Sequence, residues 1–102
     1  MIIITGIITV ESEAEISKVR DALVQRAQRS QKDAGCLDYV FCQSLENPCE
    51  IRLIEKWENE DLLNAHLKIP DTQFDQVIAV AKITSAIVLS NEVVEEKELL
   101  NR

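Results

Sequence analysis

The sequence predicts a single α+β domain with the element order β-α-β-β-α-β. Branched apolar residues alternate with polar ones near positions 2–10, 36–45, 51–58 and 83–94, which is typical of strands. Apolar residues recur at helical spacing between about positions 13 and 34, and again in two shorter runs between 59 and 81. At 102 residues, with 46% hydrophobic and 28% charged residues, the whole chain, 1–102, has the size and composition of one globular domain.

Composition excludes several classes of partner. The formal net charge is −7 and only 11 residues are Lys or Arg, so neither nucleic acid nor an anionic membrane surface is expected as a partner. The apolar N-terminus reaches Glu11 too early for a membrane-spanning helix and lacks the basic region of a signal peptide. The spacing of Cys36, Cys42 and Cys49 matches no paired metal-binding framework. We expect reduced thiols, no bound metal and a cytoplasmic protein.

The first half of the chain is predicted to form one strand and one long helix. The strand is apolar on both faces, because Ile2, Ile4 and Ile8 alternate with Ile3, Thr5, Ile7 and Thr9. Ser12 and Glu15 have the spacing of a capping box, which predicts that the helix begins at about Glu13. Gly35 can adopt the left-handed conformation of a C-terminal cap, so the helix is expected to continue to Ala34.

A hairpin is predicted next, with its turn at Asn47 and Pro48. Its first strand places three apolar residues on one face, Leu37, Tyr39 and Phe41. Its second strand places four residues on one face, Ile51, Leu53, Glu55 and Trp57.

Two short helices and a final strand complete the pattern. Asn59 can cap the first of these helices, and Pro70 with Asp71 begins the second. The final strand, near 83–94, has Ile83, Ile87 and Leu89 on one face and Ala86 and Val88 on the other. The charged tail, 95–102, is expected to fray.

This element order is the ferredoxin-like pattern, in which the crossovers place the helices on one face of an antiparallel sheet. The first and last strands are apolar on both faces, yet the helices can cover only one of them. An open sheet of Ile and Val exceeds the apolar patch that monomers usually expose. We therefore expect a twofold homodimer packed sheet to sheet, with an incompletely covered monomer as the alternative.

The only Trp and the only His, Trp57 and His66, lie nine positions apart across a strand–helix junction. Glu55 shares a strand face with Trp57, and an inward-facing carboxylate is costly unless it is paired. The chain could fold His66 back over the same end of the sheet, so we interpret these three as candidate catalytic residues. The structural alternatives are that Trp57 only packs in the core, that His66 is exposed, and that Glu55 pairs with Arg52, with Lys56 or with a partner subunit.

Four further side chains are candidate substrate-binding residues. They are three aromatic residues and one carboxylate: Tyr39, Phe41, Phe74 and Asp71. A mostly apolar cavity with a few polar groups is typical of small-molecule sites.

The segment AGCLDYVFCQSLENPCEIRLIEKWENEDLLNAHL resembles the central part of the antibiotic biosynthesis monooxygenase (ABM) family. That family has a Gly, a Tyr four residues later, a strand ending in Glu-x-Trp, and Ala-His-Leu on the next helix. The matching residues are Gly35, Tyr39, Glu55, Trp57 and Ala65-His66-Leu67. Element order and lengths extend the resemblance over nearly the whole chain.

The resemblance implies a dimeric α+β barrel with a cavity between sheet and helices in each subunit. Family members oxidise aromatic polyketides or quinols with O₂ and without flavin, metal or haem, because the deprotonated substrate supplies the electrons. A small quinol-like or phenolic substrate is therefore implied. His66 would act as the base, Trp57 would shape and desolvate the pocket, and Glu55 would orient or polarise the substrate.

One departure from the family pattern concerns Asp71, which stands where many relatives have the second His of a Pro-His pair. The haem-degrading branch has a Trp at the position of His66 and a further iron-ligating His, and this chain has neither, which argues against haem. The alternative function is a non-oxidative member of the superfamily, either a small-metabolite isomerase or a ligand-binding, stress-related dimer. A phosphorylated ligand would need basic residues near the pocket, for which Lys68 and Lys82 are the candidates.

Overall fold

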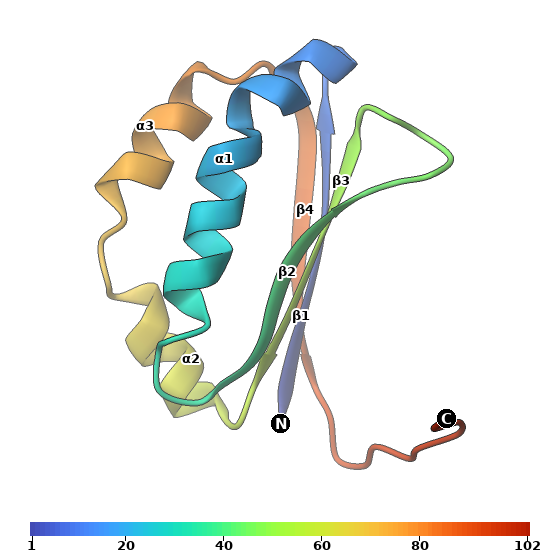
Figure 1. The fold of residues 1–102 in the computed structure, drawn as a ribbon. Coiled ribbons are helices and arrows are strands. Elements are labelled where there is room, and N and C mark those ends of the chain that lie inside the picture. Colours follow the sequence, from blue (N-terminus) through green and yellow to red (C-terminus); the bar gives the residue numbers. More distant parts are fainter.

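The computed structural model describes all 102 residues as one antiparallel four-stranded sheet with helices on one of its faces (Figure 1). The elements in chain order are β1 (Ile2–Val10), α1 (Glu13–Ser30), β2 (Cys36–Gln43), β3 (Glu50–Trp57), α2 (Glu60–Leu67), α3 (Thr72–Val80) and β4 (Ile83–Glu92). The predicted α+β, ferredoxin-like fold is confirmed, and its second helical stretch consists of the two helices α2 and α3.

The strand order β2-β3-β1-β4 places the two most buried strands, β1 and β3, at the centre of the sheet. Ile4 of β1 lies opposite Glu55 of β3 on one side and Ser90 of β4 on the other. Glu55 in turn lies opposite Tyr39 of β2. This register creates one row across all four strands, and the side chains of paired residues in such a row point to the same face of the sheet.

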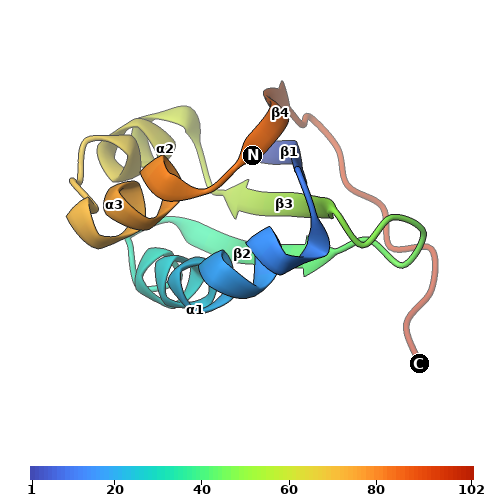
Figure 2. The ribbon, with the colours of Figure 1, turned by 90° about the horizontal axis from the view of Figure 1, so that it is seen from above.

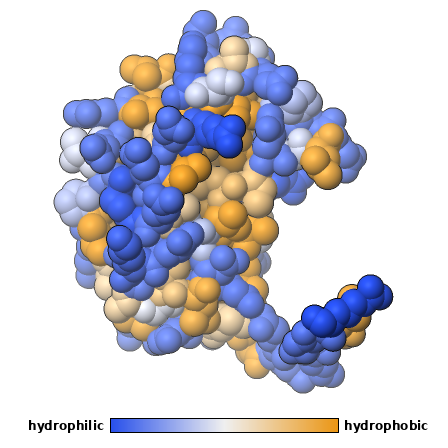
Figure 3. Space-filling view, in the orientation of Figure 1, coloured by the Kyte–Doolittle hydropathy of each residue, from blue (hydrophilic) through white to orange (hydrophobic).

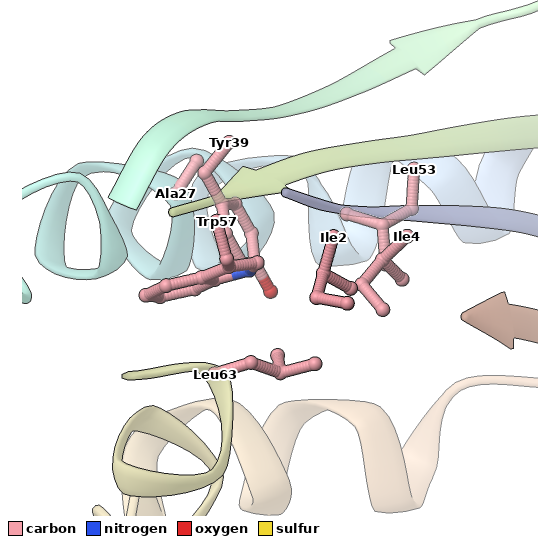
Figure 4. Close-up of a cluster of buried hydrophobic side chains, with 7 residues drawn as sticks. All are labelled: Ile2, Ile4, Ala27, Tyr39, Leu53, Trp57 and Leu63. Atoms are coloured by element: carbon pink, nitrogen blue, oxygen red, sulfur yellow. The ribbon is translucent and has the colours of Figure 1, made fainter. Parts of the chain in front are cut away.

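The core lies between the sheet and the helices, which Figure 2 shows on one side of the strands. Its larger cluster gathers residues from both layers (Figure 4): Ile2, Ile4, Ala27, Tyr39, Leu53, Trp57 and Leu63. A smaller cluster joins the first half of α1 to β3 through Val19, Leu23 and Ile51. Alternation along β3 thus buries the predicted face of that strand, Glu55 included.

The ends of α1 differ from the prediction. The helix ends at Ser30, four residues early, and Gly35 lies in the following turn with φ +82°. A side chain at Gly35 would collide with Leu62 of α2, so the glycine permits both the left-handed conformation and the close approach. At the other end, Ser12 makes no capping hydrogen bond through its side chain. The carboxylate of Glu15 pairs with Lys18 at 2.9 Å instead.

Two register shifts move apolar residues away from their predicted faces. A shift between Cys36 and Asp38 separates Leu37 from Tyr39 and leaves it 53% exposed. A shift between Thr9 and Val10 sets Ile83 opposite the buried Val10 instead of on the face of Ile87 and Leu89. Alternation read from sequence fails at such bulges because one extra residue reverses the phase of the strand.

The sheet face opposite the helices is open and largely apolar. A shallow depression of about 370 Å³ there is lined by residues of β1, β3 and β4, including Ile7, Ile54, Ile87 and Leu89. The C-terminal tail leaves β4 on this side (Figures 1 and 2), where Glu96 pairs with Lys56 at 2.6 Å. The tail, 95–102, forms no helix or strand. None of the three helices has both the length and the apolar composition to cross a membrane.

We expect the protein to be a homodimer joined through this open face, and Ile87→Lys to make it monomeric. Ile87 is 61% exposed in the single chain, so a lysine there costs little folding energy but puts a charge into the dimer contact. Sedimentation at low micromolar concentration measures the change. Val80→Lys, at an exposed position of α3 on the helix side of the sheet, is the control that stays dimeric. A wild-type monomer would contradict the expectation.

Candidate active site

Glu55 and Trp57 form a buried pair near the end of β3. Two-residue spacing in a strand places both side chains on the helix-facing side, where Trp57 is 0% and Glu55 6% exposed. The indole Nε1–H of Trp57 donates a hydrogen bond to Glu55 Oε1 at 2.9 Å. This bond satisfies the only polar atom of the indole and one oxygen of a carboxylate that would otherwise be costly to bury.

The connection after β3 folds His66 back onto this pair. Asn59 caps α2 by accepting a hydrogen bond from the Leu62 backbone N–H at 2.9 Å, as predicted. His66, 2% exposed, lies on the inward face of α2, with its ring centroid 4.5 Å from that of Trp57 and 5.8 Å from that of Tyr39. The three candidate catalytic residues and Tyr39 therefore form one contiguous group.

Two residues that the sequence did not point to bind the ring nitrogens of His66. Asp33, in the turn after α1, lies with Oδ2 2.6 Å from Nδ1. Arg26, on α1, lies with Nη2 3.3 Å from Nε2. The only sequence signal for Arg26 is its place next to the buried Ala27, at the border of the apolar face of α1. Asp33 gives no such signal, because the sequence places it at the end of the predicted helix, whereas it lies in the turn after α1.

Asp71 binds arginines of α1 and makes no hydrogen bond to the three candidate catalytic residues. Its carboxylate accepts hydrogen bonds from Arg26 at 3.2 Å and from Arg29 at 2.6 Å, and it caps α3 through the Phe74 N–H. Desolvation acts to raise the pKa of Asp71, but the hydrogen bonds from Arg29, Phe74 and Arg26 outweigh it and hold that pKa below its ordinary value. The ionised carboxylate of Asp71, which accepts hydrogen bonds from both helices, thus connects α3 to α1.

The remaining aromatic candidates extend the group along α1. Phe41 and Phe74 stack with centroids 6.4 Å apart, and Phe41 meets Tyr39 edge to face at 5.8 Å. Figure 3 shows a strip of hydrophobic side chains in this region, where grooves of about 480 and 280 Å³ run between α1 and β2. Tyr39 lines the smaller groove and Phe41 lines both.

A separate cleft of about 300 Å³ lies between α2 and β4. Its apolar walls are Ile4, Leu63, Leu67, Val88 and Leu89, and its polar groups are Glu55, Glu60, Asn64 and Ser90. The helices leave this side of β4 uncovered, since all ten of its residues are exposed. Glu55 is the only one of the predicted site residues that lines the cleft, and neither Trp57 nor His66 lines any cavity.

Burial alters the acid–base properties of two neighbouring residues of this row, Glu55 and Tyr39. Desolvation raises the pKa of Glu55, while the hydrogen bond from Trp57 and the nearby His66 and Arg26 offset part of the rise. Burial raises the pKa of Tyr39 as well, and the Glu55 charge adds to that rise. Glu55 is consequently a stronger proton acceptor, once ionised, than an exposed glutamate. No group of three or more His, Cys, Asp or Glu side chains is arranged to hold a metal ion.

The sequence profile of the family described as antibiotic biosynthesis monooxygenase matches residues 1–73, which include β1, β3, α2 and Asp71. The chain belongs to this family. The resemblance in the Gly35–Leu67 segment is thereby confirmed. No curated protein matches the chain.

Solved structures with the same fold support the assignment. A Deinococcus radiodurans protein provisionally named an antibiotic biosynthesis monooxygenase is 25% identical, with a TM-score of 0.89 over 99% of this chain and 100% of its own. A similarly named Nitrosomonas europaea protein is 14% identical, with a TM-score of 0.80 over 93% and 100% of the two chains. A Bacteroides thetaiotaomicron protein described as a possible oxidoreductase is 22% identical, with a TM-score of 0.74 over 90% and 96%. The last two show the fold alone.

We expect Trp57→Phe to destabilise the protein by about 1–3 kcal/mol, because it leaves Glu55 Oε1 buried without its donor. The same change should raise the pKa of Glu55 further, since the lost hydrogen bond favours the carboxylate. Denaturant unfolding measures the first effect. A loss below about 0.5 kcal/mol, as at surface positions, would contradict the burial of this pair.

Glu55→Gln should change how stability depends on pH. A carboxyl group with a raised pKa in the folded state contributes its full stability below the ordinary glutamate value of 4.5, and that contribution is lost as pH rises through the raised value. Wild-type protein should therefore lose stability relative to Glu55→Gln across this window, as measured by denaturant unfolding at a series of pH values. The exposed Glu58→Gln is the control, and parallel profiles for all three proteins would refute the expectation.

Proposed function

We propose that this ABM-family protein is a cofactor-independent monooxygenase that oxidises a small, uncharged phenolic or quinol-like substrate with O₂. The observation that carries the proposal is the position of Glu55 in the wall of the α2–β4 cleft, with a raised pKa and one oxygen held by Trp57. A carboxylate in a mostly apolar cleft can accept the proton of a phenolic hydroxyl or of an acidic C–H group.

The reaction balances without an external reductant. Glu55 takes a proton from the substrate, and the resulting anion passes an electron to O₂. Recombination forms a C–O bond, and the peroxide anion takes the proton back from Glu55 to give a hydroperoxide, which loses water to leave a carbonyl group. In sum, a CH₂ group and O₂ become a C=O group and H₂O, so the substrate is oxidised by four electrons and O₂ is reduced by four. The apolar walls of the cleft exclude competing water from the anion.

The other candidates take roles that follow from their contacts. Trp57 orients the Glu55 carboxylate through its indole N–H, and His66 packs behind Trp57 as a positioning residue. In this proposal Glu55 replaces His66 as the group that takes the substrate proton, because His66 is 2% exposed and does not line the cleft. Tyr39, next to Glu55 in the sheet, completes the aromatic wall behind the carboxylate.

The charge of the cleft favours an uncharged ligand over a phosphorylated one. Two glutamates, Glu55 and Glu60, line it, and no Lys or Arg does. Neither Lys68 nor Lys82 is among its lining residues, and Lys82 lies 3.9 Å from Glu11 elsewhere on the surface. A phosphate group would bring negative charge to a site without a compensating donor. The isomerase alternative for phosphorylated sugars is therefore disfavoured.

Oxygen uptake by the purified protein with a panel of uncharged quinols, anthrones and phenols tests the proposal. We expect consumption of one O₂ per carbonyl formed, and a fall of about 10²–10⁴-fold in rate for Glu55→Gln, which keeps the shape but loses the base. Glu58→Gln, an exposed change three residues along the chain, should retain the wild-type rate. Absence of uptake with the whole panel, or a Glu55→Gln variant as fast as wild type, would overturn the proposal.

A further inference from the structure

The imidazole of His66 is held between two partners of opposite kind. On one side, the Asp33 carboxylate, an acceptor without a hydrogen to donate, lies 2.6 Å from Nδ1. On the other side, the Arg26 guanidinium, which can only donate, lies 3.3 Å from Nε2. Both contacts are shielded, because the His66 side chain is 2% and the Arg26 side chain 16% exposed.

These partners determine which nitrogen carries the proton. A carboxylate at Nδ1 requires a hydrogen on that nitrogen, and a guanidinium N–H at Nε2 requires a lone pair there. Both conditions are met by one form, the neutral ring with its proton on Nδ1. In water a neutral imidazole prefers the opposite form, with the proton on Nε2, so the protein environment reverses the intrinsic preference.

Arg26 is itself fixed in place by a second carboxylate. Its Nη1 donates to Asp71 Oδ2 at 3.2 Å, and its guanidinium lies over the Phe74 ring, 5.4 Å from the centroid. Its Nε is buried without a partner, which is a cost that the contacts of the other two nitrogens offset. Because Asp71 caps α3 and also binds Arg29, the orientation of Arg26 is set by the docking of α3 on α1.

We propose that Asp33 and Arg26 are positioning residues of the active site, which hold His66 in the Nδ1–H form and fix the orientation of its ring. The His66 ring supports Trp57, and the indole N–H of Trp57 in turn orients the Glu55 carboxylate. The path is continuous: ring centroids of His66 and Trp57 are 4.5 Å apart, and the indole donates to Glu55 at 2.9 Å. The part of this proposal that concerns turnover rests on the proposed function. The part that concerns the tautomer does not.

The wild-type protein provides the first test, because it contains one His and one Trp. Long-range ¹H–¹⁵N correlation spectra at slightly alkaline pH distinguish the protonated from the unprotonated ring nitrogen without any assignment problem. We expect the proton on Nδ1 and slow exchange of the Trp57 indole proton with water. A proton on Nε2 would overturn the proposal, and this result needs no variant that might misfold.

The second test releases both partners. Asp33 or Arg26 alone favours the Nδ1–H form, so the double variant Arg26→Met/Asp33→Ala is needed. In this variant we expect the His66 proton to move to Nε2 and the Trp57 indole proton to exchange faster with water. Arg20→Met/Asp21→Ala makes the same changes at exposed positions of α1 and should leave both signals unchanged. A double variant that folds and keeps the wild-type indole exchange after its tautomer changes would refute the link to Trp57.

Turnover of a phenol or quinol that the wild type oxidises completes the test. In Arg26→Met/Asp33→Ala we expect kcat to fall by about 10²-fold, as for a displaced catalytic group, while KM stays near the wild-type value because the cleft lining is intact. An unchanged kcat together with a changed tautomer would overturn the positioning role. If the wild type oxidises nothing, the proposed function fails, whereas the tautomer and indole measurements still decide the positioning of the ring.

Discussion

The hydrogen bond from Trp57 to Glu55 is the interaction on which the organisation of the site depends. It allows a carboxylate to occupy the most buried strand of the sheet, and it requires the largest side chain of the chain to lie flat beside it. His66, Tyr39 and Leu63 then pack around the indole. A polar pair in the middle of an apolar core is costly to assemble and even more costly to break, so it specifies one arrangement of β3 against α2.

A second constraint is the uneven cover that three helices provide for four strands. α1 lies along β2 and β3, and α2 covers the end of β3, while the helix-facing side of β4 is left exposed. The α2–β4 cleft is the direct result of this offset. The charged contacts of Asp71 with Arg26 and Arg29 hold α3 against α1.

Much of the fold follows from local patterns in the sequence. The alternation of β3 predicts which of its residues are buried, and Asn59 and Asp71 are correct caps because their side chains need only reach a backbone N–H three residues away. The errors at Leu37 and Ile83 arise from bulges, whose extra residue leaves no compositional signal. The early end of α1 similarly depends on tertiary contact, since Gly35 is required by the approach of Leu62 rather than by the helix terminus.

The candidate site was predictable in its centre but not at its edges. Glu55, Trp57 and His66 could be linked because they are rare or costly residues at one strand–helix junction. Asp33 precedes His66 by 33 residues and Arg26 precedes it by 40 residues, and only the packed structure reveals that they bind its ring. Nor does the sequence separate the residues that line a cavity from those that lie behind its wall. That distinction follows from side-chain exposure, which sheet register and helix offset decide together.

The exposure of β4 also gives the two walls of the cleft different mechanical character. The wall that carries Glu55 belongs to the centre of the sheet and packs against the core. β4, in contrast, is an edge strand whose only neighbouring strand is β1 and whose residues are all exposed. Segments with few buried contacts open at lower free energy than core segments. The Glu55 side of the cleft is therefore rigid and the β4 side is more flexible, so the cleft can accommodate ligands of different thickness without moving the carboxylate. Under the proposed function, tolerance of substrate shape and selectivity for the reaction then come from opposite sides of the same cavity.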